Sequence, residues 1–395
     1  MLINIPIKTQ IIIFTIYRTI FNTGLRMIYP YLPVFARGLN VDVKSISLVV
    51  SASLVTSIIG VFMAPLVDRF GRKLGMNIGL LIFILGTGAV YFFPTYTAFF
   101  AGLLLAYLGA NIFTPSLLAY IGDRINFSQR GTSVALTEMS WSLSFIIFVP
   151  MAGILIQEFN WAFPFLASCL MASLCFIFLQ MFLPNQKSNP TLSNFKLKDI
   201  GKAITHKPAL AILLSGLMLI FGIGMINLMF GVWLEDSYNV KVAALGTASI
   251  VIGIAELSGA SLSAMFSDLF GKKRSINTSL ILDFIVIMLF PLLVRTYTGA
   301  LVWLFLFYIF AEYAIVSILA LSTEVVPWAR TTFIALFTAA LTLGMGLGTY
   351  IAPYIYSFSF RVLSLVCGGL LIIALFALAK TNIKKNRKSY INFVP

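Results

Sequence analysis

Polar and charged side chains recur at helical spacing in one apolar stretch near the N-terminus. Arg18, Asn22, Arg26 and Tyr29 follow one another at intervals of four, four and three residues, which places them on one face of a helix. With a rise of about 1.5 Å per residue, Arg18 and Arg26 stand about 12 Å apart along the helix axis. Two fixed cations on one face can pair with carboxylates or bind an anionic group.

Four carboxylates lie inside other apolar stretches, at Glu138, Glu256, Asp283 and Glu312. A charged side chain costs about 2.5 kcal/mol or more at the centre of a bilayer, so residues of this kind point to a functional pathway. Glu138 lies about as deep as Arg18 from the end of its stretch that is expected on the same side of the membrane. For Asp283, a hydrogen bond between helices is the expected role.

The stretches that carry these residues have the composition of a membrane protein. Of the 395 residues, 10% are charged and 60% are hydrophobic, whereas about a quarter are charged in a soluble protein. Runs of about 20 apolar residues, long enough to cross a hydrocarbon core of about 30 Å, recur along the chain. We expect membrane-spanning helices near residues 10–36, 46–67, 74–93, 97–121, 132–156, 161–183, 209–234, 243–267, 275–294, 299–324, 332–356 and 361–379.

The net charge of +14 reflects orientation in the membrane. Lys and Arg residues gather in the segments expected on one side, which the positive-inside rule makes cytoplasmic together with both termini. Nucleic acid is therefore not an expected partner. The three cysteines lie within predicted spans, too few and too dispersed for a disulfide framework or a metal site. We expect no metal and no cofactor.

The spans fall into two halves. We predict an N-terminal six-helix bundle over residues 1–183, a cytoplasmic linker over 184–208, a C-terminal six-helix bundle over 209–379 and a basic cytoplasmic tail over 380–395. The linker has apolar residues at helical spacing and is expected to lie on the membrane surface. Anionic lipids are the expected neighbours of the basic tail.

A charged loop occurs twice, 200 positions apart. Residues 64–73 read Ala-Pro-Leu-Val-Asp-Arg-Phe-Gly-Arg-Lys, and residues 264–273 read Ala-Met-Phe-Ser-Asp-Leu-Phe-Gly-Lys-Lys. The repeat indicates two copies of one membrane module in the same orientation, related by an axis along the membrane normal. The charged and turn positions of the two copies, with one further arginine in each half, are Asp68, Arg69, Gly71, Arg72, Lys73 and Arg130, and Asp268, Gly271, Lys272, Lys273 and Arg330.

This loop resembles that of the major facilitator superfamily, which reads roughly Gly-x-Leu-Ala-Asp-Arg-x-Gly-Arg-Lys. The resemblance implies an all-α membrane protein with twelve helices in two six-helix bundles, related by a pseudo-two-fold axis along the membrane normal. It further implies that Asp68 braces the start of span eleven, and Asp268 that of span five, when the cytoplasmic side is closed. A solvated charged turn is the alternative. The matching residues are Leu66, Asp68, Arg69, Gly71, Arg72 and Lys73, with Ala64 in place of the leading glycine.

The resemblance also indicates which residues can meet. In that family, spans one, four, seven and ten line a central cavity, with spans two, five, eight and eleven beside them, so Arg26, Glu256 and Glu312 are expected at a substrate site. Spans one and five are neighbours there, which with their equal depth implies an ion pair of Arg18 with Glu138 whose role is either structural or functional. The spans carry four acids but only two arginines, so at least one acid lacks a counter-charge. We hypothesise that Glu312 or Glu256 binds and releases a proton under the control of Arg26. Residues at spacings of four share helix faces and suit an amphiphilic ligand: Tyr107, Asn111 and Pro115 in span four, and Tyr308 with Glu312 in span ten. Simple packing of the tyrosines is the alternative.

These features predict a secondary transporter that works by alternating access. Pro150 and Gly153 keep part of a glycine and proline pattern found in many antiporters of the family, whereas Leu105 stands where proton-coupled members often carry Arg. We expect proton-coupled efflux of a small organic or amphiphilic compound by a monomer in a bacterial cytoplasmic membrane. The alternative is uptake or exchange of an anionic metabolite without proton coupling. No Walker loop occurs, so ATP is not the expected energy source. A membrane-embedded lipid enzyme is a remote third candidate, because no hydrolase motif occurs.

Overall fold

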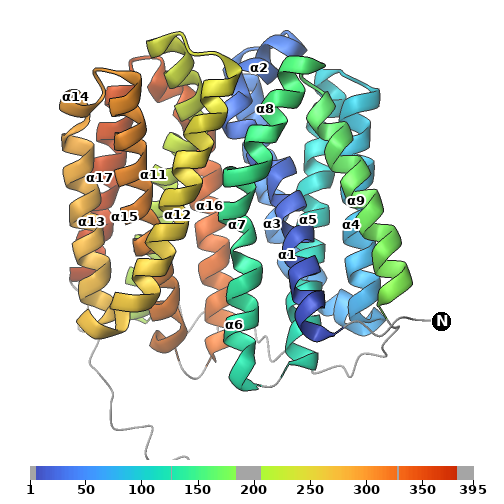
Figure 1. Cartoon of the computed structure of the whole chain (residues 1–395). Coiled ribbons are helices and arrows are strands. Elements are labelled where there is room, and N and C mark those ends of the chain that lie inside the picture. The colour runs from blue at the N-terminus through green and yellow to red at the C-terminus, as the bar shows by residue number, and fades with distance from the viewer. Residues whose placement is uncertain (1–5, 126, 184–205, 327–328, 380–395) are drawn as a thin grey trace, which may run out of the picture.

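The chain forms long helices that run between two ends of the molecule (Figure 1). The computed structural model describes residues 6–125, 127–183, 206–326 and 329–379; the side chains of residues 8, 57–70, 127–132 and 330–331 lie outside this description. We call the end at which α3 meets α4 the basic end, because Arg72, Lys73, Lys272 and Lys273 lie there. The opposite end, at which α2 meets α3, is the far end.

Six spans form the first bundle. They are α1 (Ile7–Arg26) with α2 (Ile28–Leu39), α3 (Val43–Phe70), α4 (Arg72–Phe92), α5 (Tyr96–Arg124), the composite span α6 (Phe127–Glu138), α7 (Ser140–Leu143), η1 (Ser144–Phe148) and α8 (Val149–Glu158), and α9 (Phe163–Phe182).

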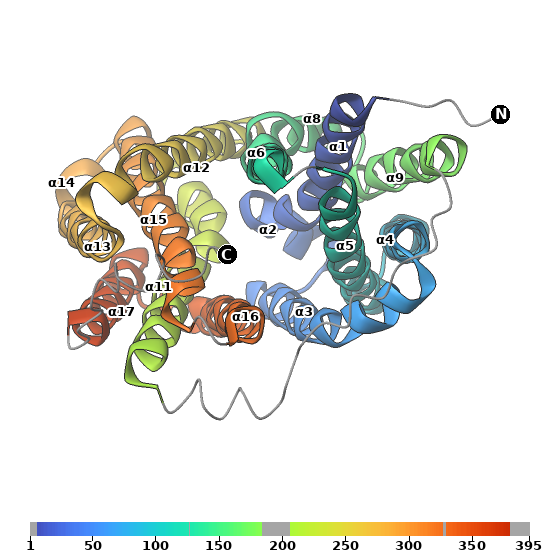
Figure 2. The ribbon, with the colours of Figure 1, turned by 90° about the horizontal axis from the view of Figure 1, so that it is seen from below.

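Six more spans form the second bundle, on the other side of the molecule (Figure 2). By length and apolar composition, nine of the described helices can cross a membrane alone, or ten when the bent pair α1–α2 counts as one. The expected twelve-helix, all-α architecture is confirmed. The second-bundle spans are α11 (Lys207–Tyr238), α12 (Val242–Phe270), α13 (Lys272–Met288) with α14 (Phe290–Leu293), α15 (Tyr297–Val325), α16 (Arg330–Tyr356) and α17 (Phe360–Ala379).

The first span is bent rather than straight. Its two parts, α1 and α2, meet at 47°, and Tyr31 has the non-helical angles φ −99° and ψ 15°. Pro30 and Pro33 have no amide hydrogen, so the carbonyl groups four residues earlier lose their helical partners. The bend therefore follows Arg26 directly and frees backbone carbonyl groups beside it.

The duplication seen in the sequence extends to local structure. Gly71 and Gly271 both adopt positive φ, 101° and 86°, a conformation that glycine adopts without steric cost. At the far end, Asn40 and Asn239 end α2 and α11 in the left-handed conformation, with φ of 54° and 51°. Asparagine is one of the few other residues that tolerate this conformation.

A second local motif also occurs in both halves. Thr95 caps α5 by accepting a hydrogen bond from the amide of Ala98, and Thr296 caps α15 in the same way. The next residue is tyrosine in each case: Tyr96 donates to the carbonyl of Ser45 at 3.2 Å, and Tyr297 donates to that of Ala244 at 2.7 Å. Each half therefore joins its second and fourth spans by the same contact.

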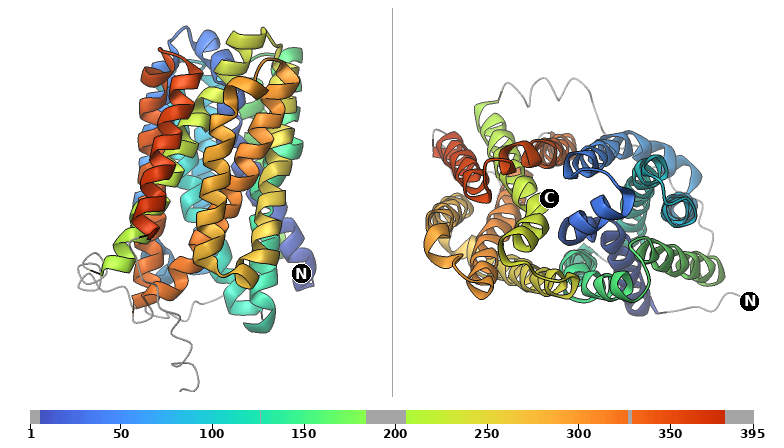
Figure 3. Two further views of the ribbon diagram at one scale, coloured as in Figure 1. Left: turned by 90° about the vertical axis from the view of Figure 1, so that its left-hand side faces the viewer. Right: turned by 90° about the horizontal axis from the view of Figure 1, so that it is seen from above.

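The two bundles contact each other at the far end, where α2 lies beside α11 (Figure 3, right). Gly231 of α11 packs directly on the backbone of α2: an ideal Cβ there would stand 2.7 Å from the carbonyl oxygen of Tyr29 and closer still to that of Pro30. Arg37 of α2 donates to Glu235 of α11 at 2.5 Å. Along α3, the Ser51 hydroxyl donates to the carbonyl of Gly346 on α16 at 2.7 Å.

Towards the basic end the bundles diverge. One buried apolar cluster of the described residues fills the second bundle and continues into the far half of the first, whereas a separate cluster is confined to the basic half of the first bundle. Helix α12 packs on α8, η1 and α7, while α6 packs on α1 and α5. Figure 1 shows α12 leaning away from α6 towards the basic end. The two bundles are therefore joined at the far end and separate towards the basic end.

Gly231→Ala should loosen the far end. The added methyl group would overlap backbone carbonyl groups of α2, so α2 and α11 must separate. We expect the free energy of unfolding to fall by about 1–3 kcal/mol, the usual cost of overpacking. Disulfide cross-linking between cysteines introduced at positions 37 and 235, in a background without the native cysteines, should fall in parallel.

Gly369→Ala on α17 is the matched control, because a methyl group there meets no atom within 4 Å. Alanine is favoured over glycine within a helix by about 0.5–1 kcal/mol, so this variant should keep its stability and its cross-linking yield. Equal losses in both variants would contradict the close contact at Gly231.

Candidate functional site

A buried ion pair crosses the interface between the two bundles. The Arg26 Nη2 atom donates to Glu256 Oε1 at 2.5 Å, and Nη1 donates to Oε2 at 3.1 Å. The side chains are only 3% and 5% exposed. Arg26 ends α1 and Glu256 belongs to α12, so the two-pronged contact joins the first span to the eighth. Paired geometry of this kind satisfies both carboxylate oxygens.

The fifth span completes the surroundings of Arg26. Its Nη1 atom also donates to the carbonyl of Trp141 on α7 at 2.7 Å. The guanidinium lies over the rings of Trp141 and Phe145, 4.3 Å and 3.6 Å from the ring centroids, which stabilises a desolvated cation. Phe145 belongs to the π-helical turn η1, an irregularity that often marks functional sites.

Glu312 lies next to this pair because α12 and α15 approach closely. An ideal Cβ on Gly259 would stand 3.0 Å from the Cβ atom of Glu312. Glu256 precedes Gly259 by three residues and so shares its helix face. Glu312 interacts electrostatically with Glu256, Arg26 and Glu138, but has no ion pair or hydrogen bond within the described ranges. The expected meeting of Arg26, Glu256 and Glu312 is thus found.

Two tyrosine contacts border the cluster. Tyr29, just beyond the bend, is buried and hydrogen-bonds the buried Tyr107 of α5. Tyr308 of α15 donates to Asn227 Oδ1 of α11 and interacts electrostatically with Arg26 and Glu256. Spans one and four, and spans seven and ten, are therefore linked around the same centre.

A second ion pair lies nearer the basic end. Arg18 donates to both carboxylate oxygens of Glu138, at 2.6 Å and 3.0 Å, as their depths and the family resemblance together predict. The Arg18 side chain is 8% exposed and that of Glu138 is 52% exposed. Asn22, one turn further along α1, donates to the Ser140 hydroxyl at 3.2 Å. Asn111 on α5 is half-buried.

The repeated loops make matching contacts within each bundle. Arg72 pairs with Asp123 at the end of α5 at 3.1 Å, and Lys272 pairs with Glu324 at the end of α15 at 2.5 Å. Lys73 donates to the carbonyl of Leu183 at 2.5 Å, which satisfies a free carbonyl after α9. Lys273 lies in the corresponding place on α13.

The predicted latch contacts are not seen in this arrangement. Asp268 is 84% exposed, and its partner is Lys272 at 3.8 Å, so it does not brace span five here. The side chains of Asp68, Arg69, Arg130 and Arg330 lie outside the described part. Their latch role applies to a closed basic end and stays a prediction.

Sequence reasoning missed the contribution of the fifth span at Trp141 and Phe145. Glu138, Trp141 and Phe145 follow one another at spacings of three and four, which places them on one helix face. That spacing was a usable signal. The Trp141 carbonyl was not, because a backbone acceptor leaves no trace in residue type.

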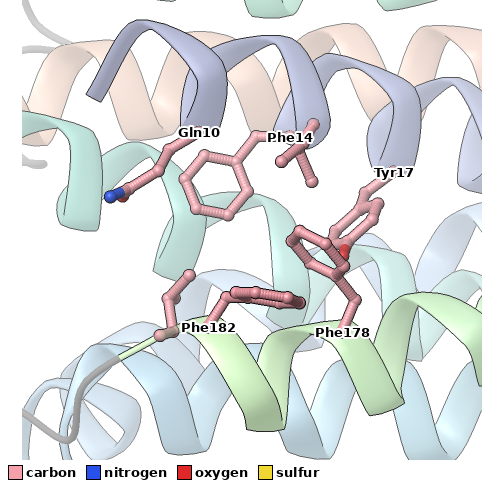
Figure 4. Close-up of a pocket in the computed structure, with 7 residues that line it drawn as sticks. Gln10, Phe14, Tyr17, Phe178 and Phe182 are labelled. Carbon is pink, nitrogen blue, oxygen red and sulfur yellow. The ribbon is translucent and has the colours of Figure 1, made fainter. Parts of the chain in front are cut away.

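A small pocket between α1 and α9 lies apart from this cluster, close to the basic end (Figure 4). Its Tyr17 hydroxyl is buried and has no hydrogen-bond partner among the described residues. The lining is aromatic and aliphatic with one amide, so it offers no charge to a substrate. The lining residues are Gln10, Ile13, Phe14, Tyr17, Phe178, Phe182 and Leu183.

Glu256→Gln should destabilise the fold, because it leaves the Arg26 guanidinium buried without a counter-charge. Breaking a buried pair costs about 3–5 kcal/mol, which should appear as a lower free energy of unfolding in detergent. Glu235→Gln is the control: its partner Arg37 is 60% exposed, and exposed pairs contribute at most about 1 kcal/mol. Equal losses would show that the central pair does not hold the bundles together.

Comparison with known proteins agrees with this architecture. The family profile described as the Major Facilitator Superfamily matches residues 14–214 and 212–391. The uncharacterized MFS-type transporter YwfA of Bacillus subtilis (strain 168) is 34% identical over 140 residues; the match covers 35% of this chain and 34% of YwfA, so the chain spans about a third of that relative. Multidrug resistance protein 2 of the same organism is 25% identical over 300 residues, 73% of this chain and 74% of that protein.

A solved structure shows the same fold. The crystal structure of the nucleoside transporter NupG superimposes with a TM-score of 0.77 at 16% identity and covers 95% of this chain and 99% of that chain. The family match extends over both bundles. The chain therefore belongs to the Major Facilitator Superfamily and is a multi-pass membrane transporter rather than an enzyme.

Proposed function

We propose that this transporter exports a small organic or amphiphilic compound in exchange for protons, through alternating access to one central site. The charge balance of the central cluster carries the proposal. Arg26 is matched by Glu256, and the adjacent Glu312 has no cationic partner of its own among the described residues. A third carboxylate beside a neutralised pair is a site that a proton can occupy.

The physical reason lies in the cost of a buried charge. An ionised carboxylate away from water is stable only with a cation or several hydrogen-bond donors. Glu312 is half-buried and has neither in the described part, and the nearby Glu256 charge repels a second negative charge. A proton and a substrate would occupy this site in turn, with the substrate supplying the compensating interactions. Proton movement and substrate movement would then be coupled.

The aromatic surroundings support an organic ligand. Trp141, Phe145, Tyr29 and Tyr107 lie around Arg26, and mixed apolar and hydrogen-bonding surfaces suit amphiphilic molecules. The name of the relative Multidrug resistance protein 2 is in keeping with such a substrate. An anionic metabolite is less favoured, because the nearby carboxylates already neutralise both arginines of the first span.

Alternating access would exchange the closed far end for a closed basic end. We propose that the basic end faces the cytoplasm of a bacterial cell, with both chain termini on that side, and that one chain is the functional unit. The far-end contacts of Arg37 with Glu235 would then break as Asp68 and Asp268 form theirs. Rocking of packed bundles about a central contact allows this exchange.

Glu312→Gln should remove the drive by a pH gradient, since an amide cannot carry the proton. In proteoliposomes of purified protein, the movement of a lipophilic cationic dye under an imposed pH gradient should fall to the level of empty liposomes. Dye exchange without a gradient should persist, because the aromatic surroundings remain.

Glu158→Gln is the matched control, because Glu158 ends α8 and is exposed; this variant should respond to the gradient like the unchanged protein. The proposal fails if Glu312→Gln and Glu256→Gln both retain full gradient-driven movement.

A further inference from the structure

A buried carboxyl group lies inside the second bundle, away from the central cluster. Asp283 on α13 is 1% exposed, and neither carboxylate oxygen has a hydrogen-bond partner among the described residues. The expectation of a hydrogen bond between helices is therefore wrong for this part of the chain. Helix packing alone does not explain an acid at this position.

The helices around Asp283 offer no counter-charge. Helix α13 packs on α12, α14, α15 and α17; among their described residues, the interacting titratable group is the thiol of Cys367 on α17. Helix α14 has no titratable residue, and the nearest charged residue on α13 itself, Arg274, is more than two turns away. Glu256 of α12 and Glu312 of α15 belong to the central cluster.

These surroundings determine the ionisation state. A carboxylate with no cation and no donor is strongly disfavoured in an apolar interior, so Asp283 is a neutral acid in this arrangement. Even the neutral acid leaves a donor and an acceptor unpaired, which an apolar residue of similar size would avoid. An acid retained inside a membrane bundle at such a cost points to a function that requires its titration.

Between Asp283 and the central cluster, the electrostatic neighbours are the polar side chains of Cys367 and Tyr308. Cys367, which interacts with Asp283, also interacts electrostatically with Tyr308. Tyr308 in turn donates to Asn227 and interacts with Glu256.

We propose that Asp283 is a second proton-binding site, loaded in the arrangement described here and emptied when the second bundle rearranges. On loading, a proton binds one carboxylate oxygen; on release, the proton passes to water that reaches the site. This inference concerns proton binding alone and stands apart from the identity of the exported compound.

Infrared spectroscopy of the full-length protein in lipid tests the proposal directly. At neutral pH, the protein should show carbonyl stretching bands of protonated carboxylic acids, and the band that carbon-13 labelling of aspartate shifts should be lost in Asp283→Asn. Glu312→Gln, which alters the other unpaired acid, should retain the band. Raising the pH should abolish the band while the protein remains folded, and the pH profile of dye transport should shift in Asp283→Asn.

Each other outcome overturns the proposal. Absence of the band at neutral pH would show an ionised Asp283, and a rise in melting temperature with added sodium would then identify a metal cation in place of the proton. A band that persists at every pH up to unfolding, with an unchanged transport profile in Asp283→Asn, would show a purely structural acid. If Asp283→Asn does not fold, carbon-13 labelling of aspartate in the unchanged protein should shift the band.

Discussion

The arrangement of the two bundles depends on the ion pair between Arg26 and Glu256. Both side chains are almost completely buried, and each belongs to a different bundle, so parting the bundles at this point would separate the two charges. The fifth span adds the Trp141 carbonyl and two aromatic faces to Arg26. The pair therefore stabilises contact between the bundles and also concentrates charge where a substrate or a proton can compete for it.

The rest of the fold positions this pair. The proline-containing bend after Arg26 frees carbonyl groups and directs α2 against α11 at Gly231, which closes the far end. On the other side of the pair, Gly259 allows α15 to approach α12 and places Glu312 beside Glu256. Towards the basic end the buried apolar clusters separate. Rocking of the two bundles requires a contact near the centre of the molecule, with tight packing at one end and looser packing at the other. The ion pair and the two ends of this molecule have that geometry.

Much of this could be predicted from residue type and spacing. Apolar length located the spans, and duplication of the charged loop indicated two bundles. Equal depth, together with the neighbouring spans of the family that the loop resembles, predicted the pair of Arg18 with Glu138. Contacts through the backbone could not be predicted, because the Trp141 carbonyl and the freed carbonyl groups of the first span depend on local geometry rather than side-chain type. For Asp283 the expectation of a hydrogen bond failed, since sequence spacing shows which face a residue occupies but not whether a partner stands opposite.

The most direct test of the account is the distance between spin labels at positions 135 on α6 and 264 on α12, measured by pulsed electron paramagnetic resonance in a background without native cysteines. Both positions are exposed and lie on opposite bundles towards the basic end. With the central pair intact, we expect one long distance, because the bundles are apart there. Glu256→Gln should add a population at shorter distance, since the arrangement is no longer held by the pair. An identical distance distribution in both proteins would contradict the central role of Arg26 and Glu256.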